Sequence, residues 1–138
     1  ELFLCSMIGY LTIAIQNCNS LNISTACPRQ VKKIKSIVDT DADIIFISDL
    51  RLNCSDKVKD LELSLLSTKG QYRFVYNSSK NSRGVGILFK NSLGIDILKR
   101  YSDPEENILG LKVRIRNQVI NLISVYGPNT DQNCRVFF

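Results

Sequence analysis

The sequence predicts an α/β (α+β) fold, in which a mixed, mostly antiparallel sheet carries one or two helices. Short apolar runs of strand length recur along the chain, and the densest, Ile44–Ser48, has four large apolar side chains in five residues. Such a run is typical of a strand buried on both faces. After Pro28, apolar residues recur at helical spacing, and over residues 111–116 apolar and charged residues alternate strictly.

The first strand is expected at residues 11–15, with a start as early as Phe3. Pro28 suits the first turn of a helix. Residues 43–48 then return as a strand parallel to the first, through a right-handed crossover. Apolar residues of this helix recur at helical spacing, at Val31, Ile34 and Val38. Its other faces carry Lys32, Lys33 and Lys35, which predict a solvated surface rather than a phosphate contact.

Residues 51–70 are ambiguous, with one short helix suggested by the spacing of Val58, Leu61 and Leu65. Residues 72–76 and 84–89, joined by a polar loop, predict an antiparallel hairpin. Gly84 and Gly86 lie two apart in its second strand. Close packing or a bulge explains them better than a phosphate loop, since no helix follows to supply amide donors.

A further strand is expected at residues 95–101, and residues 119–126 predict a central strand because aliphatic side chains dominate them. Between these two lies a strand of alternating character. The cations of that strand either face DNA or protect a sheet edge against aggregation. The alternation sets Leu111, Val113 and Ile115 inward against Lys112, Arg114 and Arg116 outward.

The composition limits the partners and the catalytic groups that the chain can use. The chain has 138 residues, which fits one domain or part of one, and its net charge of +5 leans toward an anionic partner. It contains no histidine, which excludes a Ser-His-Asp or Cys-His site within these residues and removes the commonest general base. Five cysteines without a C-x-x-C pair favour a reduced, intracellular protein.

The apolar start of the chain raises the question of a signal peptide. Against it, the first residue is acidic, no small-x-small cleavage site follows, and the run is too short to cross a bilayer. We therefore expect no membrane partner. Because Glu1 rather than Met comes first, we expect the chain to begin inside a longer reading frame.

Polar side chains follow three of the expected strands. Asp49 comes directly after the run Ile44–Ser48, where sheets of this kind present ligand-binding groups, and a carboxylate there is a candidate ligand for a divalent metal. Alternatives stay open for each residue, since Asp49 also suits a turn, Tyr126 a half-buried strand end, and the asparagines a loop. The other strand-end candidates are Asn17 and Asn19 after the first strand, and Tyr126 and Asn129 after the last.

Four blocks, in this order, resemble those of the endonuclease/exonuclease/phosphatase superfamily. They are similar above all to the apurinic-type endonuclease domain of non-LTR (LINE-type) retrotransposons. No single block is specific, but four in sequence over most of the chain are a stronger signal. The blocks are NCNSLN at 17–22, DIIFISDLRL at 43–52, GVGIL at 84–88 and VYGPNT at 125–130.

The resemblance implies the first half of a DNase I-like four-layer α/β sandwich and an enzyme that nicks DNA with Mg2+ or Mn2+. It also implies roles for individual residues. Asn17 would contact the scissile phosphate or orient the attacking water, and Tyr126 would hydrogen-bond the phosphate. Asp49 would ligate the metal with Asn19 close by. Asn129 would contact the DNA backbone. Apart from the resemblance, the outward-facing cations Arg114 and Arg116 are further candidate DNA contacts.

The sequence departs from the family in two ways. Asp49 stands where the family has Glu and is one methylene shorter. The family's later G-D-x-N block and Asp-His pair have no counterpart here, because Asp131 and Asn133 follow the Tyr126 block at once. We therefore expect residues 1–138 to be a partial domain that ends before its C-terminal half and is inactive alone.

The resemblance further implies DNA as partner, a downstream reverse transcriptase domain in the full-length protein, and a nuclear location. Two alternatives remain. One is a degenerate, non-catalytic remnant that binds nucleic acid weakly through Lys112, Arg114 and Arg116. The other is a phosphatase of the same superfamily, against which the Tyr126 block argues.

Overall fold

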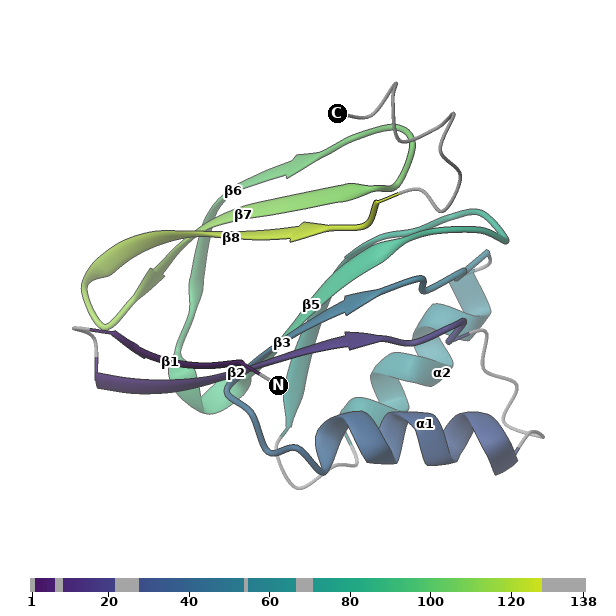
Figure 1. Cartoon of the computed structure of the whole chain (residues 1–138), viewed down its shortest axis with the longest axis horizontal. Helices are drawn as coiled ribbons and strands as arrows, with labels where there is room; N and C mark the ends of the chain where they lie inside the picture. The colour runs from purple at the N-terminus through teal and green to yellow at the C-terminus, as the bar shows by residue number, and fades with distance from the viewer. Residues whose placement is uncertain (1, 7–8, 22–27, 54, 67–70, 128–138) are drawn as a thin grey trace.

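The computed structural model describes residues 2–6, 9–21, 28–53, 55–66 and 71–127. They form three layers: two helices, a five-stranded sheet and a three-stranded sheet (Figure 1). The described residues thus supply three layers of the four expected for the complete sandwich. The elements are β1 (Leu2–Ser6), β2 (Gly9–Asn17), α1 (Pro28–Val38), β3 (Ile44–Ser48), α2 (Ser55–Leu66), β4 (Tyr72–Asn77), β5 (Val85–Lys90), the 3-10 turn η1 (Asn91–Leu93), β6 (Asp96–Ser102), β7 (Ile108–Ile115) and β8 (Gln118–Val125).

The larger sheet has the order β1-β2-β3-β5-β4, and β2 and β3 are its one parallel pair. The smaller sheet has the order β6-β7-β8 and is antiparallel throughout. The prediction of a mixed, mostly antiparallel arrangement with one or two helices is confirmed, and two helices are present. The parallel register sets Ile13 opposite Ile44 and Asn17 opposite Ser48, so β2 and β3 end side by side.

Both helices cover the same face of the larger sheet (Figure 1). α1 begins at Pro28 as predicted and buries Ile34 and Ile37. α2 forms in the ambiguous segment because its apolar residues recur at helical spacing and face the sheet. The buried positions of α2 are Val58, Leu61 and Leu65, as predicted.

β3 is buried on both faces, as its apolar run predicted. Ile45 and Ile47 pack into the core on the helical side, whereas Ile44 packs into the core between the two sheets. On the other side of that second core, β7 contributes Leu109, Leu111, Val113 and Ile115, all buried. Successive strand residues point to opposite faces, so one uninterrupted apolar run serves both cores.

Three strands differ in part from the predictions. The strand expected at residues 11–15 is confirmed as part of β2, which extends to Asn17, but the earlier start at Phe3 is wrong, because Leu2–Ser6 form a separate antiparallel strand with Leu2 opposite Ile13. β7 lies in the centre of its sheet, so edge protection does not explain its cations, although Lys112 and Arg114 do face outward. β8 is an outer strand of the described sheet, and its aliphatic side chains are divided between a buried and an exposed face.

Within the part of the chain that the structure describes, no helix is long and apolar enough to cross a membrane.

Candidate functional site

β2, β3 and β8 run in the same direction, so their carboxyl ends lie on one side of the molecule (Figure 1). Asn17 ends β2 beside Ser48 of β3, and Asp49 follows Ser48 directly. Tyr126 follows β8 in the other sheet. The ends of β2 and β3 belong to the larger sheet and the end of β8 to the smaller sheet, so the predicted residues come from both sheets.

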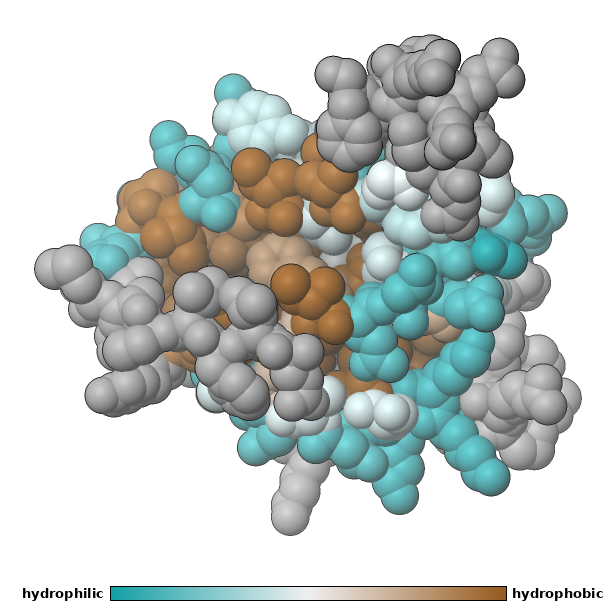
Figure 2. Space-filling view, viewed as in Figure 1, coloured by the Kyte–Doolittle hydropathy of each residue, from teal (hydrophilic) through white to brown (hydrophobic). Residues whose placement is uncertain are grey.

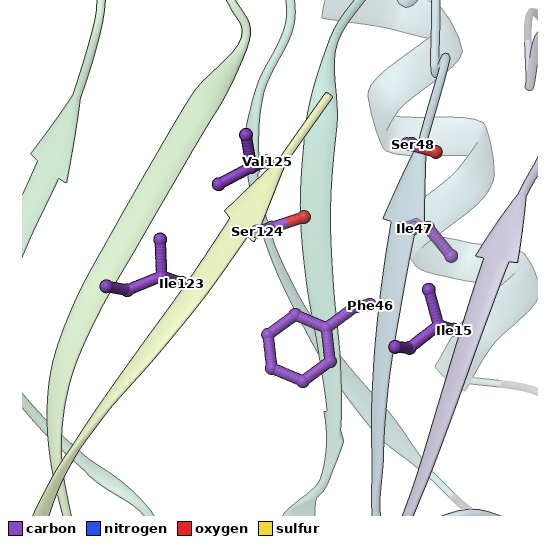
Figure 3. A pocket seen from close by; sticks show the side chains of 7 residues that line it. All are labelled: Ile15, Phe46, Ile47, Ser48, Ile123, Ser124 and Val125. Carbon is purple, nitrogen blue, oxygen red and sulfur yellow. The ribbon is translucent and has the colours of Figure 1, made fainter. Parts of the chain in front are cut away.

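A groove of about 300 Å³ lies between these strands (Figure 3). The ring of Phe46 projects from β3 toward β8, and Ser48 lies at the end of β3 (Figure 3). The walls of the groove are mostly aliphatic. Its lining residues are Ile15, Phe46, Ile47, Ser48, Ile123, Ser124 and Val125.

Much of this aliphatic surface is open to solvent. Ile15 and Ile123 are each 60% exposed, and Val125 is 51% exposed. Figure 2 shows apolar side chains gathered between the smaller sheet and the strands of the larger one. Exposed apolar surface of this kind marks a place where another surface or ligand can bind.

The carboxylate of Asp49 is paired with the guanidinium of Arg51. Nε and Nη2 of Arg51 donate to Oδ1 and Oδ2 of Asp49 at 2.8 and 2.9 Å. The side chain of Asp49 is 7% exposed and that of Arg51 is 40% exposed. Hydrogen bonding to Asp49 and its negative charge raise the pKa of Arg51 above its ordinary value.

Backbone hydrogen bonds hold the segment that carries this pair. The N–H groups of Cys18 and Ser20 donate to the carbonyl oxygens of Ser48 and Asp49 at 2.9 and 2.8 Å. On the other side, the N–H groups of Leu50 and Arg51 donate to the carbonyl oxygens of Gly84 and Arg83 at 3.1 and 2.8 Å. The chain after β3 is therefore fixed between two neighbours although it has left the regular strand.

Gly84 and Gly86 permit this close packing. Gly84 has a φ of +97°, and a Cβ there would collide with Ser78. A Cβ on Gly86 would lie 2.7 Å from Cε2 of Phe74. The packing interpretation of the two glycines is confirmed.

The loop after β2 is organised from within the chain. The N–H of Asn19 donates to Oδ1 of Asn17 at 3.0 Å, which forms a turn of the kind asparagine favours. Lys33 of α1 donates from Nζ to the carbonyl oxygens of Cys18, Asn19 and Ser20 at 3.1, 2.8 and 3.2 Å. The prediction that all three lysines of this helix are solvated was wrong for Lys33. Burial raises the pKa of the Cys18 thiol to about 12.

Tyr126 is half-buried and anchored by its backbone. Its N–H donates to the carbonyl oxygen of Asn107 at 2.8 Å, and its side chain packs against the core between the sheets. Tyr126 is close enough to Arg51 to contribute electrostatically to the raised pKa of that guanidinium. Asn107 is buried, and its Oδ1 has no hydrogen-bond partner among the described residues.

The residues present do not fit a divalent metal. Such a cation prefers several oxygen ligands, carboxylates above all. Both oxygens of Asp49 are engaged by Arg51, and Oδ1 of Asn17 accepts the Asn19 N–H. Across the described part of the chain, no three His, Cys, Asp or Glu side chains lie together as a metal site would require.

The other predicted DNA contacts lie elsewhere. Arg114 lies opposite Asp96 and Val119 near the far end of β7, roughly 20 Å along the strand from the Tyr126 end. Arg116 lies in the turn after β7 with a φ of +47°. Asn129 falls outside the described residues.

The strand ends therefore bring together four of the predicted residues. They are Asn17, Asn19, Asp49 and Tyr126, and we call this group the strand-end site.

Sequence reasoning missed three residues of this site: Arg51, Lys33 and Asn107. The signal for Arg51 was present, since a cation two residues after an acid at a strand end is a candidate ion pair. Lys33 gave no signal in the sequence, because its acceptors are carbonyl oxygens of the loop after β2 and only the packing of α1 brings them within reach. Asn107 gave none either, because only the pairing of β7 with β8 brings it beside Tyr126.

No protein-family model matches the chain. Solved structures are similar to it, among them an AP endonuclease from Archaeoglobus fulgidus with 21% identity and a TM-score of 0.58, over 86% of this chain and 41% of that one. The endonuclease domain of TRAS1, a telomere-specific non-LTR retrotransposon, matches with 14% identity and a TM-score of 0.54, over 92% and 51%. ANGEL2, a 2',3'-cyclic phosphatase, matches with 18% identity and a TM-score of 0.58, over 86% and 41%.

These likenesses show the fold. The chain has part of the DNase I-like α/β fold, as the sequence predicted, and it spans about half the length of the structures it matches.

Proposed function

We propose that this chain is part of a DNA endonuclease domain of the retrotransposon type, and that these 138 residues bind the DNA backbone without cleaving it. The observation that carries the proposal is the meeting of Asn17, Asp49 and Tyr126 at one end of the two sheets. The order of the four sequence blocks and the likeness to the TRAS1 endonuclease domain support the retrotransposon type.

In this proposal, neutral donors hold the phosphate. The side-chain NH2 of Asn17 and the hydroxyl of Tyr126 are both able to donate to a phosphate oxygen. The net charge of +5 favours approach of the DNA backbone. Asn129, Arg114 and Arg116 are proposed to extend the contact along the DNA, outside the strand-end site.

Hydrolysis is not expected from these residues alone. The metal ligands that the sequence led us to expect, Asp49 and Asn19, do not form a metal site in the described structure, since Asp49 is engaged by Arg51. We propose that an active domain needs groups beyond these 138 residues, and that a reverse transcriptase domain follows in the full-length protein. A nuclear location would accord with DNA as the partner.

Two measurements on the 138-residue chain test the proposal. Anisotropy of a labelled DNA duplex should show binding that weakens steeply as salt increases. Asn17→Ala and Tyr126→Phe should each weaken it about threefold to tenfold, because each removes one hydrogen bond to the phosphate. The matched controls are two exposed residues, Asn121→Ala within β8 and Tyr101→Phe on β6, which β7 separates from β8 in the smaller sheet.

Plasmid nicking with Mg2+ or Mn2+ should be absent. Nicking that Asp49→Ala abolishes would show that the residues suffice for catalysis, contrary to the proposal. Absence of any DNA binding at low salt would remove the proposed function altogether.

A phosphatase is the second candidate, because the TM-score to ANGEL2 equals that to the AP endonuclease. The fold therefore does not separate the two activities. Competition does: an excess of inositol phosphate should leave the DNA complex intact if the site recognises a DNA strand. Displacement of DNA by inositol phosphate at equal phosphate concentration would favour the phosphatase.

A further inference from the structure

Asp49 and Arg51 divide the strand-end site into a buried acid and an exposed cation. Each oxygen of the Asp49 carboxylate accepts one N–H of the Arg51 guanidinium, at 2.8 and 2.9 Å. Two parallel bonds of this kind fix the plane of the guanidinium as well as its position. Because the acid is 7% exposed and the arginine 40% exposed, the cation is the member of the pair that solvent and ligands can reach.

The guanidinium retains donors for a ligand. It has five N–H groups, and two of them are used by Asp49. The remaining N–H groups match the oxygens of a phosphate, which arginine binds through paired hydrogen bonds. Arg51 is therefore able to hold Asp49 and a phosphate at the same time.

The backbone is held in an unfavourable conformation to bring the pair together. Asp49 and Arg51 have φ values of +60° and +53°, a region that side chains other than glycine rarely adopt. The hydrogen bonds from Ser20 N–H to Asp49 and from Arg51 N–H to Arg83 hold both residues there. Backbone strain that neighbours maintain is concentrated at functional sites.

The same pair accounts for the poor fit of a metal. The positive charge beside Asp49 is supplied by Arg51, so a divalent cation bound to this carboxylate would be repelled by the adjacent guanidinium. We infer that Arg51, held by Asp49, binds the DNA phosphodiester directly, and that this binding requires no divalent cation. The inference rests on the proposed function, since it names the residue that contacts the phosphate in the same site.

The test is anisotropy of a short labelled DNA duplex at constant low salt, in EDTA and in Mg2+. The wild-type chain should bind equally in both. Arg51→Ala should weaken binding about tenfold or more, and Arg51→Lys should weaken it partly, because lysine keeps the charge but lacks the planar fork. Arg73→Ala is the matched control, because Arg73 lies opposite Phe89, at the other end of the sheet from Asp49, and should change affinity less than about twofold.

Arg51→Ala leaves the Asp49 carboxylate buried without its partner, which endangers folding. The double variant Asp49→Asn/Arg51→Gln removes both charges together and should fold, as circular dichroism would verify. It should lose affinity to the same extent as Arg51→Ala.

Three outcomes separate the inference from the proposed function. Equal binding in EDTA and Mg2+ with loss in the Arg51 variants supports both. DNA binding that requires Mg2+, or that the Arg51 variants leave unchanged, overturns the inference and leaves the proposed DNA binding standing. No DNA binding by the wild-type chain in either buffer overturns the proposed function and the inference with it.

Discussion

Thr12 and Asp43 fasten the parallel strands β2 and β3 to each other by reciprocal hydrogen bonds. The N–H and Oγ1 of Thr12 donate to Oδ2 of Asp43 at 2.9 and 3.0 Å. In return, the N–H of Asp43 donates to Oγ1 and to the carbonyl oxygen of Thr12 at 3.0 and 2.9 Å. These bonds lie at the start of the register that ends with Asn17 beside Ser48, so they help to position the strand-end site.

Thr12→Val should therefore lower the free energy of unfolding by about 1–2 kcal/mol, because valine keeps the shape of threonine but loses the hydroxyl that bonds Asp43. Urea denaturation measures the change. Thr12→Ser keeps the hydroxyl and should lose less. A valine variant as stable as wild type would mean that the hydroxyl contributes nothing to the pairing of β2 with β3.

Gly86→Ala should destabilise the protein by about 1–3 kcal/mol, since the new Cβ needs space that the ring of Phe74 occupies. The expected separation of 2.7 Å is too short for two carbon atoms. Thermal unfolding by circular dichroism measures the loss. Gly110→Ala, also in a strand, is the control, because its Cβ would lie 3.5 Å from Tyr101, an ordinary contact, and its effect should be clearly smaller.

Tyr72 should make stability depend on pH in the alkaline range. Its hydroxyl donates to the carbonyl oxygen of Ala42 at 2.6 Å, and burial, followed by the charges of Asp41 and Asp43, raises its pKa to about 12. A raised pKa means that the folded state favours the neutral phenol. The stability from this group is fully present below the unfolded pKa of about 10 and is lost as pH rises through 12.

Tyr72→Phe should reduce the fall in unfolding free energy between about pH 10 and pH 12 by about 1–2 kcal/mol. Urea titrations at several pH values measure it. Cys18, whose pKa is also raised to about 12, adds a decline that both proteins share. An identical pH profile for the two proteins would show that Tyr72 does not titrate in this window.

The exposed apolar groove should bind the dye ANS in the folded state. Ile123→Ser should lower the dye fluorescence, and because Ile123 is 60% exposed it should change the free energy of unfolding by no more than about 0.5 kcal/mol. Val119→Ser, also exposed on β8 but outside the groove lining, should leave the fluorescence unchanged. Equal loss in both variants would mean that the dye does not bind in the groove.

Local sequence patterns determined most of the elements. The run Ile44–Ser48 predicted a doubly buried strand, the spacing after Pro28 predicted α1, and the alternation over residues 111–116 predicted which side chains of β7 face inward. Each of these signals comes from neighbours within one element. The helix repeats about every 3.6 residues and the strand every two, so the side chains of one face recur in the sequence at that spacing.

Only the tertiary structure decided which elements meet. It placed β7 in the centre of its sheet, β8 on the outside, and Lys33 against the carbonyl groups of the loop after β2. It also paired the carboxylate of Asp49 with Arg51, whereas the sequence motif had assigned that carboxylate to a metal. A carboxylate takes the strongest partner that the surrounding chain brings within reach, and that partner depends on backbone angles and packing that no local pattern specifies.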